Sequence, residues 1–219
     1  MTRRPYDNAG RVEQARATQR RVLEAARELI IERGPTAVSM RDIAAHARVS
    51  VETLYKTFGT RAVLIKNVYD VTLAGDDESQ GIAGRPEIQT IVAAVDPREK
   101  LARYAALARR LAERLGPLQY RLRAAAHSGD RDLQGLIGTV DAERLAGAGR
   151  LIHHLVDTGG LRAGLDPDRA RDIVWALISP EVYDLLAGDR RWSHDEYEHW
   201  LAQTLADTIA PVPKADRNA

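Results

Sequence analysis

The chain has 219 residues, 44% hydrophobic and 29% charged, which is typical of a globular protein with one or two domains. It contains no cysteine, which excludes disulfides, thiolate catalysis and thiolate metal sites. No apolar run approaches the roughly 20 residues of a membrane span, and the polar N-terminal sequence lacks the apolar centre of a secretory signal, so we expect a cytoplasmic protein with no membrane contact.

The net charge of +1 is unevenly distributed. Residues 1–74 hold 13 Lys or Arg against 8 Asp or Glu, a balance of +5, and the rest of the chain carries −4. A basic end of this kind is either a solvated surface or a nucleic-acid contact.

Residues 1–17 form a basic arm, for which we weigh two interpretations. The arm either follows the DNA minor groove and phosphates, or is a largely disordered tail that adds nonspecific, salt-sensitive affinity, which we favour. The arginines of the arm and of the residues just after it are Arg3, Arg4, Arg11, Arg16, Arg20 and Arg21.

A first helix is predicted over residues 18–33, where apolar residues recur at the spacing of one helical face. Gly34 and Pro35 end it. A second helix, capped by Ser39 in a short capping box with Asp42, extends to about Ala47. After a tight turn, Ser50 caps a third short helix in "VSVETLYKTF".

Leu54 and Phe58 define the inward face of the third helix, and the opposite face is centred on Glu52 and Lys56. Three helices with this tight turn are arranged as in a helix-turn-helix DNA reader, although any small helical bundle can share the topology. The outer-face side chains can all hydrogen-bond, which favours DNA.

In such a reader, Val51, Glu52 and Thr53 meet base edges, where an acid can accept from a cytosine amino group and a methyl can contact thymine. Tyr55 and Lys56 have the reach for phosphates. Arg41, at the start of the second helix, and Arg61, in the first turn of a fourth, suit further backbone contacts. The complete predicted DNA-binding set is Arg41, Ser50, Val51, Glu52, Thr53, Tyr55, Lys56 and Arg61.

The fourth helix begins at Thr60, and the Gly-rich, acidic segment "AGDDESQGIAGRPE" reads as a linker, so we place a domain boundary near residue 75. The pattern beyond it is helical throughout. We predict helices over residues 96–115, 118–127, 132–158, 166–187 and 193–209, the first ended by a Gly-Pro pair and the fourth containing Pro180. This proline should kink its helix, and the kink either exposes a carbonyl to a cavity or only fits the helix to its neighbours.

The predicted fold is therefore all-α. It consists of the arm, a helix-turn-helix domain over residues 18–75, a larger helical domain over residues 76–211 and a polar tail over residues 212–219.

The block "RRVLEAARELIIERGPTAVSMRDIAAHARVSVETLYKTFGTRAVLIKNVY" resembles the N-terminal domain of the TetR family of transcriptional regulators. Apolar, cap and surface positions match together over about 50 residues. Two positions depart from the family pattern: Arg61 replaces the usual lysine and keeps its charge, while Arg48 lies in the turn where glycine is common. A left-handed arginine there costs about 1 kcal/mol.

The resemblance implies a ligand-responsive regulator, most often a repressor, that binds a near-palindromic operator as a homodimer and releases it when a small molecule occupies the C-terminal domain. No cofactor is implied. We assign the dimer interface to the last two helices, whose apolar faces are broader than a monomer core alone explains. Candidate ligand contacts, each also a candidate for ordinary core packing, are Tyr104, Leu107, Tyr120, Leu122, Arg123, His127, Leu151, Trp175, Ile178 and Tyr183.

Two other classes of function compete with DNA binding: an enzyme and a protein-interaction module. An enzyme is not expected: His194 and His199 lie on different faces of a helix, so they form no metal pair, and no phosphate loop or nucleophile motif occurs. The alternative is a helical protein-interaction module without specific DNA binding, whose basic end meets an acidic partner. Hydrogen-bonding rather than apolar groups on the third helix weigh against it.

Overall fold

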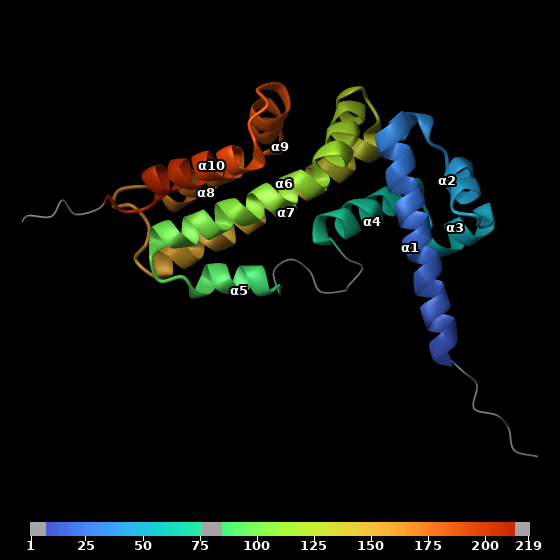
Figure 1. The fold of residues 1–219 in the computed structure, drawn as a ribbon, viewed down its shortest axis with the longest axis horizontal. Helices are drawn as coiled ribbons and strands as arrows, with labels where there is room; N and C mark the ends of the chain where they lie inside the picture. Colours follow the sequence, from blue (N-terminus) through green and yellow to red (C-terminus); the bar gives the residue numbers. More distant parts are fainter. Residues whose placement is uncertain (1–7, 76–84, 213–219) are drawn as a thin grey trace, which may run out of the picture. The chain divides into compact units, whose positions relative to one another are not determined.

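The computed structural model describes residues 8–75 and 85–212, and within these ranges every regular element is helical (Figure 1). The chain divides into two compact units. Unit 1 comprises residues 1–77 and 117–137, and unit 2 comprises residues 78–116 and 138–219. Two long helices, α6 (Pro97–His127) and α7 (Arg131–Asp157), contribute residues to both units.

Unit 1 contains α1 (Asn8–Arg33), the 3-10 turn η1 (Pro35–Ala37), α2 (Met40–His46), α3 (Val51–Phe58) and α4 (Arg61–Ala74). The predicted apolar face of α1 is buried. It packs against α2 and α4, whose own apolar residues are also buried. The cap predictions are confirmed: Ser39 and Asp42 form the capping box, and Ser50 caps α3. Thr60 also caps α4, which begins at Arg61.

The expectation of a disordered arm is wrong for its described part, because α1 begins at Asn8 rather than at residue 18. Arg11, Arg16 and Arg20 are therefore helical. No side chain of residues 10–21 is buried, so this half of α1 shows no apolar periodicity for a pattern search to detect. Its alanines, arginines and glutamines are good helix formers. Arg3 and Arg4 lie outside the described residues.

Unit 2 contains α5 (Pro86–Ala93), its parts of α6 and α7, α8 (Pro167–Leu177), α9 (Pro180–Tyr183), the π-helical segment η3 (Asp184–Asp189) and α10 (His194–Ile209). Its core joins Ile91 of α5 to apolar residues of α6, α7, α8 and α10, among them Leu101, Leu155, Val174 and Leu201. Within the described residues no helix is long and apolar enough to span a membrane.

Two predicted helix boundaries are wrong. The break at Gly116 and Pro117 does not occur, and α6 continues through them, with Leu115 and Leu118 buried on either side. The predicted helix over residues 166–187 is instead interrupted before Pro180, which occupies the first position of α9 behind its cap Ser179. A proline at the start of a helix needs no hydrogen-bond partner for its nitrogen, so no kink forms.

The sequence pattern does not predict helix α5, because the start of this helix falls in the predicted linker.

Three basic side chains from α6 and α7 bind successive carbonyls at the C-terminal end of α5. Lys100 Nζ donates to Ile91 O at 3.1 Å and to Val92 O at 2.9 Å, Arg103 donates to Thr90 O, and His154 Nε2 lies 3.2 Å from Val92 O. Burial and neighbouring Arg103 lower the pKa of Lys100, whose side chain is almost completely enclosed.

Candidate nucleic-acid interface

The turn between α2 and α3 is held by backbone bonds and by one side chain from α1. Val49 N donates to Ala44 O at 3.0 Å, and Arg48 adopts a left-handed conformation with φ of 55°. Arg21 Nε donates to Ala47 O at 2.9 Å, so a side chain of α1 satisfies a carbonyl at the C-terminal end of α2. These contacts fix the direction in which α3 leaves the turn.

The two faces of α3 are divided as the sequence predicts. Leu54 and Phe58 are buried, whereas Glu52, Thr53 and Lys56 are exposed and Tyr55 is 51% exposed. Val51, at the first position of the helix, is half-buried. Burial of Leu54 and Phe58 anchors the helix and leaves its polar face to solvent.

Two hydroxyls at the start of α3 already have partners. Ser50 Oγ accepts from Thr53 N at 3.1 Å and lies 2.8 Å from Thr53 Oγ1. The Ser50 hydroxyl therefore serves as a cap, and the methyl group of Thr53 is the part of that side chain best suited to meeting a base.

The start of α2 presents Arg41, whose side chain is exposed. In the capping box, Ser39 N donates to Asp42 Oδ2 at 2.9 Å, and Asp42 N donates to Ser39 Oγ at 3.2 Å. Hydrogen bonds from the Ser39 side chain and backbone lower the pKa of Asp42, which is therefore an anion at neutral pH. Because this carboxylate already occupies the helix terminus, Arg41 is the group there that suits a phosphate.

Arg61, predicted to contact the DNA backbone, has two partners within unit 1. Its guanidinium donates to Pro35 O and forms an ion pair with Asp130 at 3.5 Å. Asp130 Oδ1 also accepts from Leu133 N at the start of α7. Arg61 therefore connects α4, η1 and the start of α7, a role that sequence spacing could not indicate because Asp130 lies 69 positions away.

The predicted ligand contacts separate into two groups. Tyr104, Leu107, Leu151, Trp175, Ile178 and Tyr183 belong to the core cluster of unit 2. The others, Tyr120, Leu122, Arg123 and His127, lie on the part of α6 that belongs to unit 1. Among these, Tyr120 and His127 are exposed and Leu122 is buried. Only the first six are thus brought together by the fold of one unit.

Beside the core of unit 2 lies Arg144, a half-buried arginine that no sequence pattern indicates. The Arg144 guanidinium lies 4.5 Å from the centre of the Trp175 ring, donates to Trp175 O and contacts Asp141 at 3.3 Å. Trp175 Nε1 in turn donates to Asp141 O at 3.2 Å. Tyr104 also lies near this guanidinium, and burial raises its pKa to about 12.

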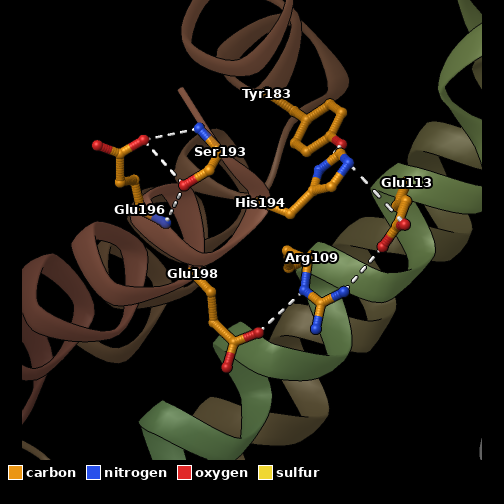
Figure 2. Close-up of polar contacts among 7 residues, drawn as sticks. All are labelled: Arg109, Glu113, Tyr183, Ser193, His194, Glu196 and Glu198. Carbon is orange, nitrogen blue, oxygen red and sulfur yellow. Dashed lines mark hydrogen bonds and ion pairs between the residues drawn. The ribbon is translucent and has the colours of Figure 1, made fainter. Parts of the chain in front are cut away.

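A second polar network in unit 2 joins α6, α9 and α10 (Figure 2). The hydroxyl of Tyr183 lies 2.8 Å from His194 Nδ1, and Glu113 approaches the other ring nitrogen at 3.9 Å. Arg109 pairs with Glu113 at 2.8 Å and with Glu198 at 3.0 Å. These contacts hold the first turn of α10 on α6, and the described residues contain no cluster of three or more acidic or histidine side chains that could hold a metal ion.

Part of the apolar surface assigned to a dimer interface is used within unit 2. Val174, Tyr197, Leu201, Leu205 and Ile209 are buried in its core. The other large apolar residues of these helices are Ile173, Leu177, Ile178, Leu185, Leu186 and Trp200. All except Leu185 are partly buried and pack against the core, whereas Leu185 is exposed.

A match to a known family lies within unit 1. Residues 22–68 match the family model described as bacterial regulatory proteins, tetR family. An HTH-type transcriptional repressor of Mycobacterium tuberculosis is 41% identical over 75 residues, which cover 32% of this chain and 38% of the repressor. The match therefore spans less than two fifths of that relative.

Solved structures extend the likeness of the fold to most of the chain. A Rhodococcus protein described as a TetR-family transcriptional regulator has a TM-score of 0.69 at 20% identity, covering 89% of this chain and all of the other. The transcriptional regulator FadR of Bacillus subtilis, solved with stearoyl-CoA, has a TM-score of 0.66 at 20% identity, covering 85% of this chain and 96% of the other.

Proposed function

Since its N-terminal domain makes this chain a member of the TetR family of bacterial regulatory proteins, we propose that it is a ligand-responsive transcriptional regulator acting as a repressor. The observation that carries the proposal is α3, with Leu54 and Phe58 buried and an opposite face of exposed hydrogen-bonding groups. The proposed activity is binding of double-stranded DNA in the cytoplasm, without catalysis.

On DNA, α3 lies in the major groove with its N-terminal end towards the bases. Val51, Glu52 and Thr53 read sequence, and a good contact to a base edge discriminates by about 1–3 kcal/mol. Tyr55 and Lys56 position the helix on phosphates. Arg41 adds a backbone contact from the start of α2, and Ser50 acts by fixing the first turn of α3.

The functional protein is proposed to be a homodimer through the last two predicted helices, residues 166–187 and 193–209, which in the structure comprise α8, α9, part of η3 and α10. The incompletely covered apolar side chains of the last helices, with Leu185 57% exposed, support this assignment. A two-fold dimer presents two copies of α3 to a near-palindromic operator. Sedimentation at micromolar concentration tests it: Leu185→Glu together with Ile173→Glu should shift a dimer to monomer, and a wild-type monomer would refute it.

A small-molecule effector is proposed to bind within unit 2 and to release the operator. The six candidate contacts that gather there support this location. FadR of Bacillus subtilis, which has a similar fold, was solved in complex with stearoyl-CoA, and this supports the proposal of a small-molecule effector. The effector of this chain is to be sought among compounds related to the genes beside its operator.

Selection of duplexes from a fragment library of the source genome tests DNA binding. The wild-type protein should enrich a near-palindromic sequence. Tyr55→Ala with Lys56→Ala should weaken binding to it by about 100-fold and reduce the salt dependence by about one unit of slope per protomer. Tyr120→Ala with Arg131→Ala removes another exposed tyrosine and cation of unit 1 and should leave binding unchanged. Enrichment of no sequence, or equal effects of the two pairs, would contradict the proposal.

A further inference from the structure

The N-terminal half of α1, residues 10–21, is a helix whose side chains are exposed or, at Ala17 and Thr18, half-buried. Between residues 10 and 21 no side chain is buried, and burial begins at Val22 and Leu23. In the view of Figure 1, this half of α1 continues beyond α3 and α4 towards the start of the chain. This extension adds no buried side chain to the core of unit 1, so we seek its function in binding rather than in folding.

Its charge indicates the chemistry of a partner. Residues 10–21 contain four arginines and one glutamate, a net charge of +3 over three turns. Arg11, Arg16 and Arg20 are all exposed. A helix carrying cations at this density complements the phosphates of a duplex, which follow one another along each strand at about 3.4 Å along the axis.

The position of the extension relative to α3 comes from Arg21. Its hydrogen bond to Ala47 O holds the base of the extension against the turn that leads into α3. Ser50, the cap of α3, follows Ala47 by three residues. The cationic extension therefore begins beside the end of α3 that enters the major groove in the proposed complex.

We propose that the extension, defined as residues 10–21 of α1, is a second DNA-binding element that contacts the phosphates of duplex flanking the operator without reading its sequence. The inference rests on the proposed function. From Arg11 to Arg21 the helix is about 15 Å long, the length of about four base pairs. Each half-site should thus extend about four base pairs beyond the part read by α3.

The test uses the full-length protein and the operator obtained by selection, with flanks of 0, 4 and 8 base pairs on each side. Wild-type affinity should rise with the first four flanking base pairs and then remain constant. Arg11→Gln with Arg16→Gln and Arg20→Gln should abolish that gain and lower the slope of log K against log salt by about 2.7 per protomer, at about 0.9 per contact. Glutamine has similar helix propensity, and circular dichroism verifies that helicity is retained.

The matched control removes the same charge from unit 2. Arg114→Gln with Arg150→Gln and Arg190→Gln changes exposed arginines outside the proposed dimer helices and should leave flank and salt dependence as in the wild type. Equal slopes and equal flank dependence in the α1 variant and the wild type would overturn the inference, and would leave an acidic protein as the partner of this helix. Loss of affinity on shuffling the flank sequence would also overturn it. The proposed function fails separately, when the wild type selects no sequence.

Discussion

Substitution of Arg61 distinguishes a DNA contact from an internal structural role for this side chain. The sequence predicts a phosphate contact, whereas the structure pairs its guanidinium with Pro35 O and Asp130. Both side chains of the ion pair are largely shielded, with 24% and 17% of their surfaces exposed. Arg61→Gln removes the charge. If the role of Arg61 is structural, the free energy of unfolding should fall; if Arg61 contacts phosphate, the affinity for DNA and its salt dependence should fall instead.

The expected loss of stability follows from the geometry. At 3.5 Å the attraction of two unit charges is about 4–5 kcal/mol at an effective dielectric constant of about 20, and desolvation leaves a net of about 1–2 kcal/mol. The bond from the guanidinium to Pro35 O contributes about another 1 kcal/mol. Arg61→Gln should therefore destabilise unit 1 by about 2–3 kcal/mol.

Asp130→Asn is the matched partner for a double-mutant cycle, because the asparagine oxygen keeps the cap of α7, while its amide replaces the charged oxygen that accepts from Arg61. The coupling energy between the two changes should be about 1–2 kcal/mol. Urea unfolding is followed by far-ultraviolet circular dichroism, since Trp175, Trp192 and Trp200 all belong to unit 2 and their fluorescence does not report on unit 1.

Binding of Arg61→Gln to the operator is measured under conditions where the variant is fully folded. The structural role predicts a salt slope equal to that of the wild type. A loss of stability below about 0.5 kcal/mol, together with a slope reduced by about one unit per protomer, would refute the reasoning and support the phosphate contact.

Three further predictions concern the backbone, the packing and the ionisation of the folded chain. Arg48 is left-handed, so Arg48→Gly should be at least as stable as the wild type and Arg48→Val less stable than either by about 1–2 kcal/mol in urea unfolding; equal stabilities would contradict strain in the turn. Gly160→Ala should destabilise unit 2 by about 1–3 kcal/mol, because its Cβ would lie 2.9 Å from Pro97 Cγ, whereas Gly138→Ala, with nothing within 4 Å, should be neutral or stabilising. Tyr104 keeps its proton in the folded state up to about pH 12 but loses it near pH 10 when unfolded, so it should contribute a fall in stability of about 2.7 kcal/mol between these values. Tyr183 and Tyr197, whose pKa values burial also raises, add to the fall, and Tyr104→Phe should reduce it by the Tyr104 contribution alone.

Local signals in the sequence were sufficient for the parts of the fold that depend on neighbours in the chain. The capping box at Ser39 and the cap at Ser50 depend on residues three positions away, and both occur as predicted. The division of α3 into a buried and an exposed face follows from helical geometry alone, because Leu54 and Phe58 are one turn apart.

Helix boundaries could not be predicted from the sequence where local signals conflict with packing or where the helix has no apolar stripe. Gly116 and Pro117 end a helix by local rules, yet α6 continues because buried leucines hold both sides of the pair. The first half of α1 is helical although no periodic pattern predicts it, because a helix without a buried face has no apolar periodicity.

Short-range periodicity and capping specify the all-helical class, the helix-turn-helix and the side chains presented by α3, so these can be predicted from the sequence. The partners of the arginines depend instead on how the helices pack. Arg61 with Asp130, Arg144 with Trp175 and Arg21 with Ala47 are separated by 69, 31 and 26 positions. No local pattern specifies such pairs, because they form when packed helices bring distant residues together.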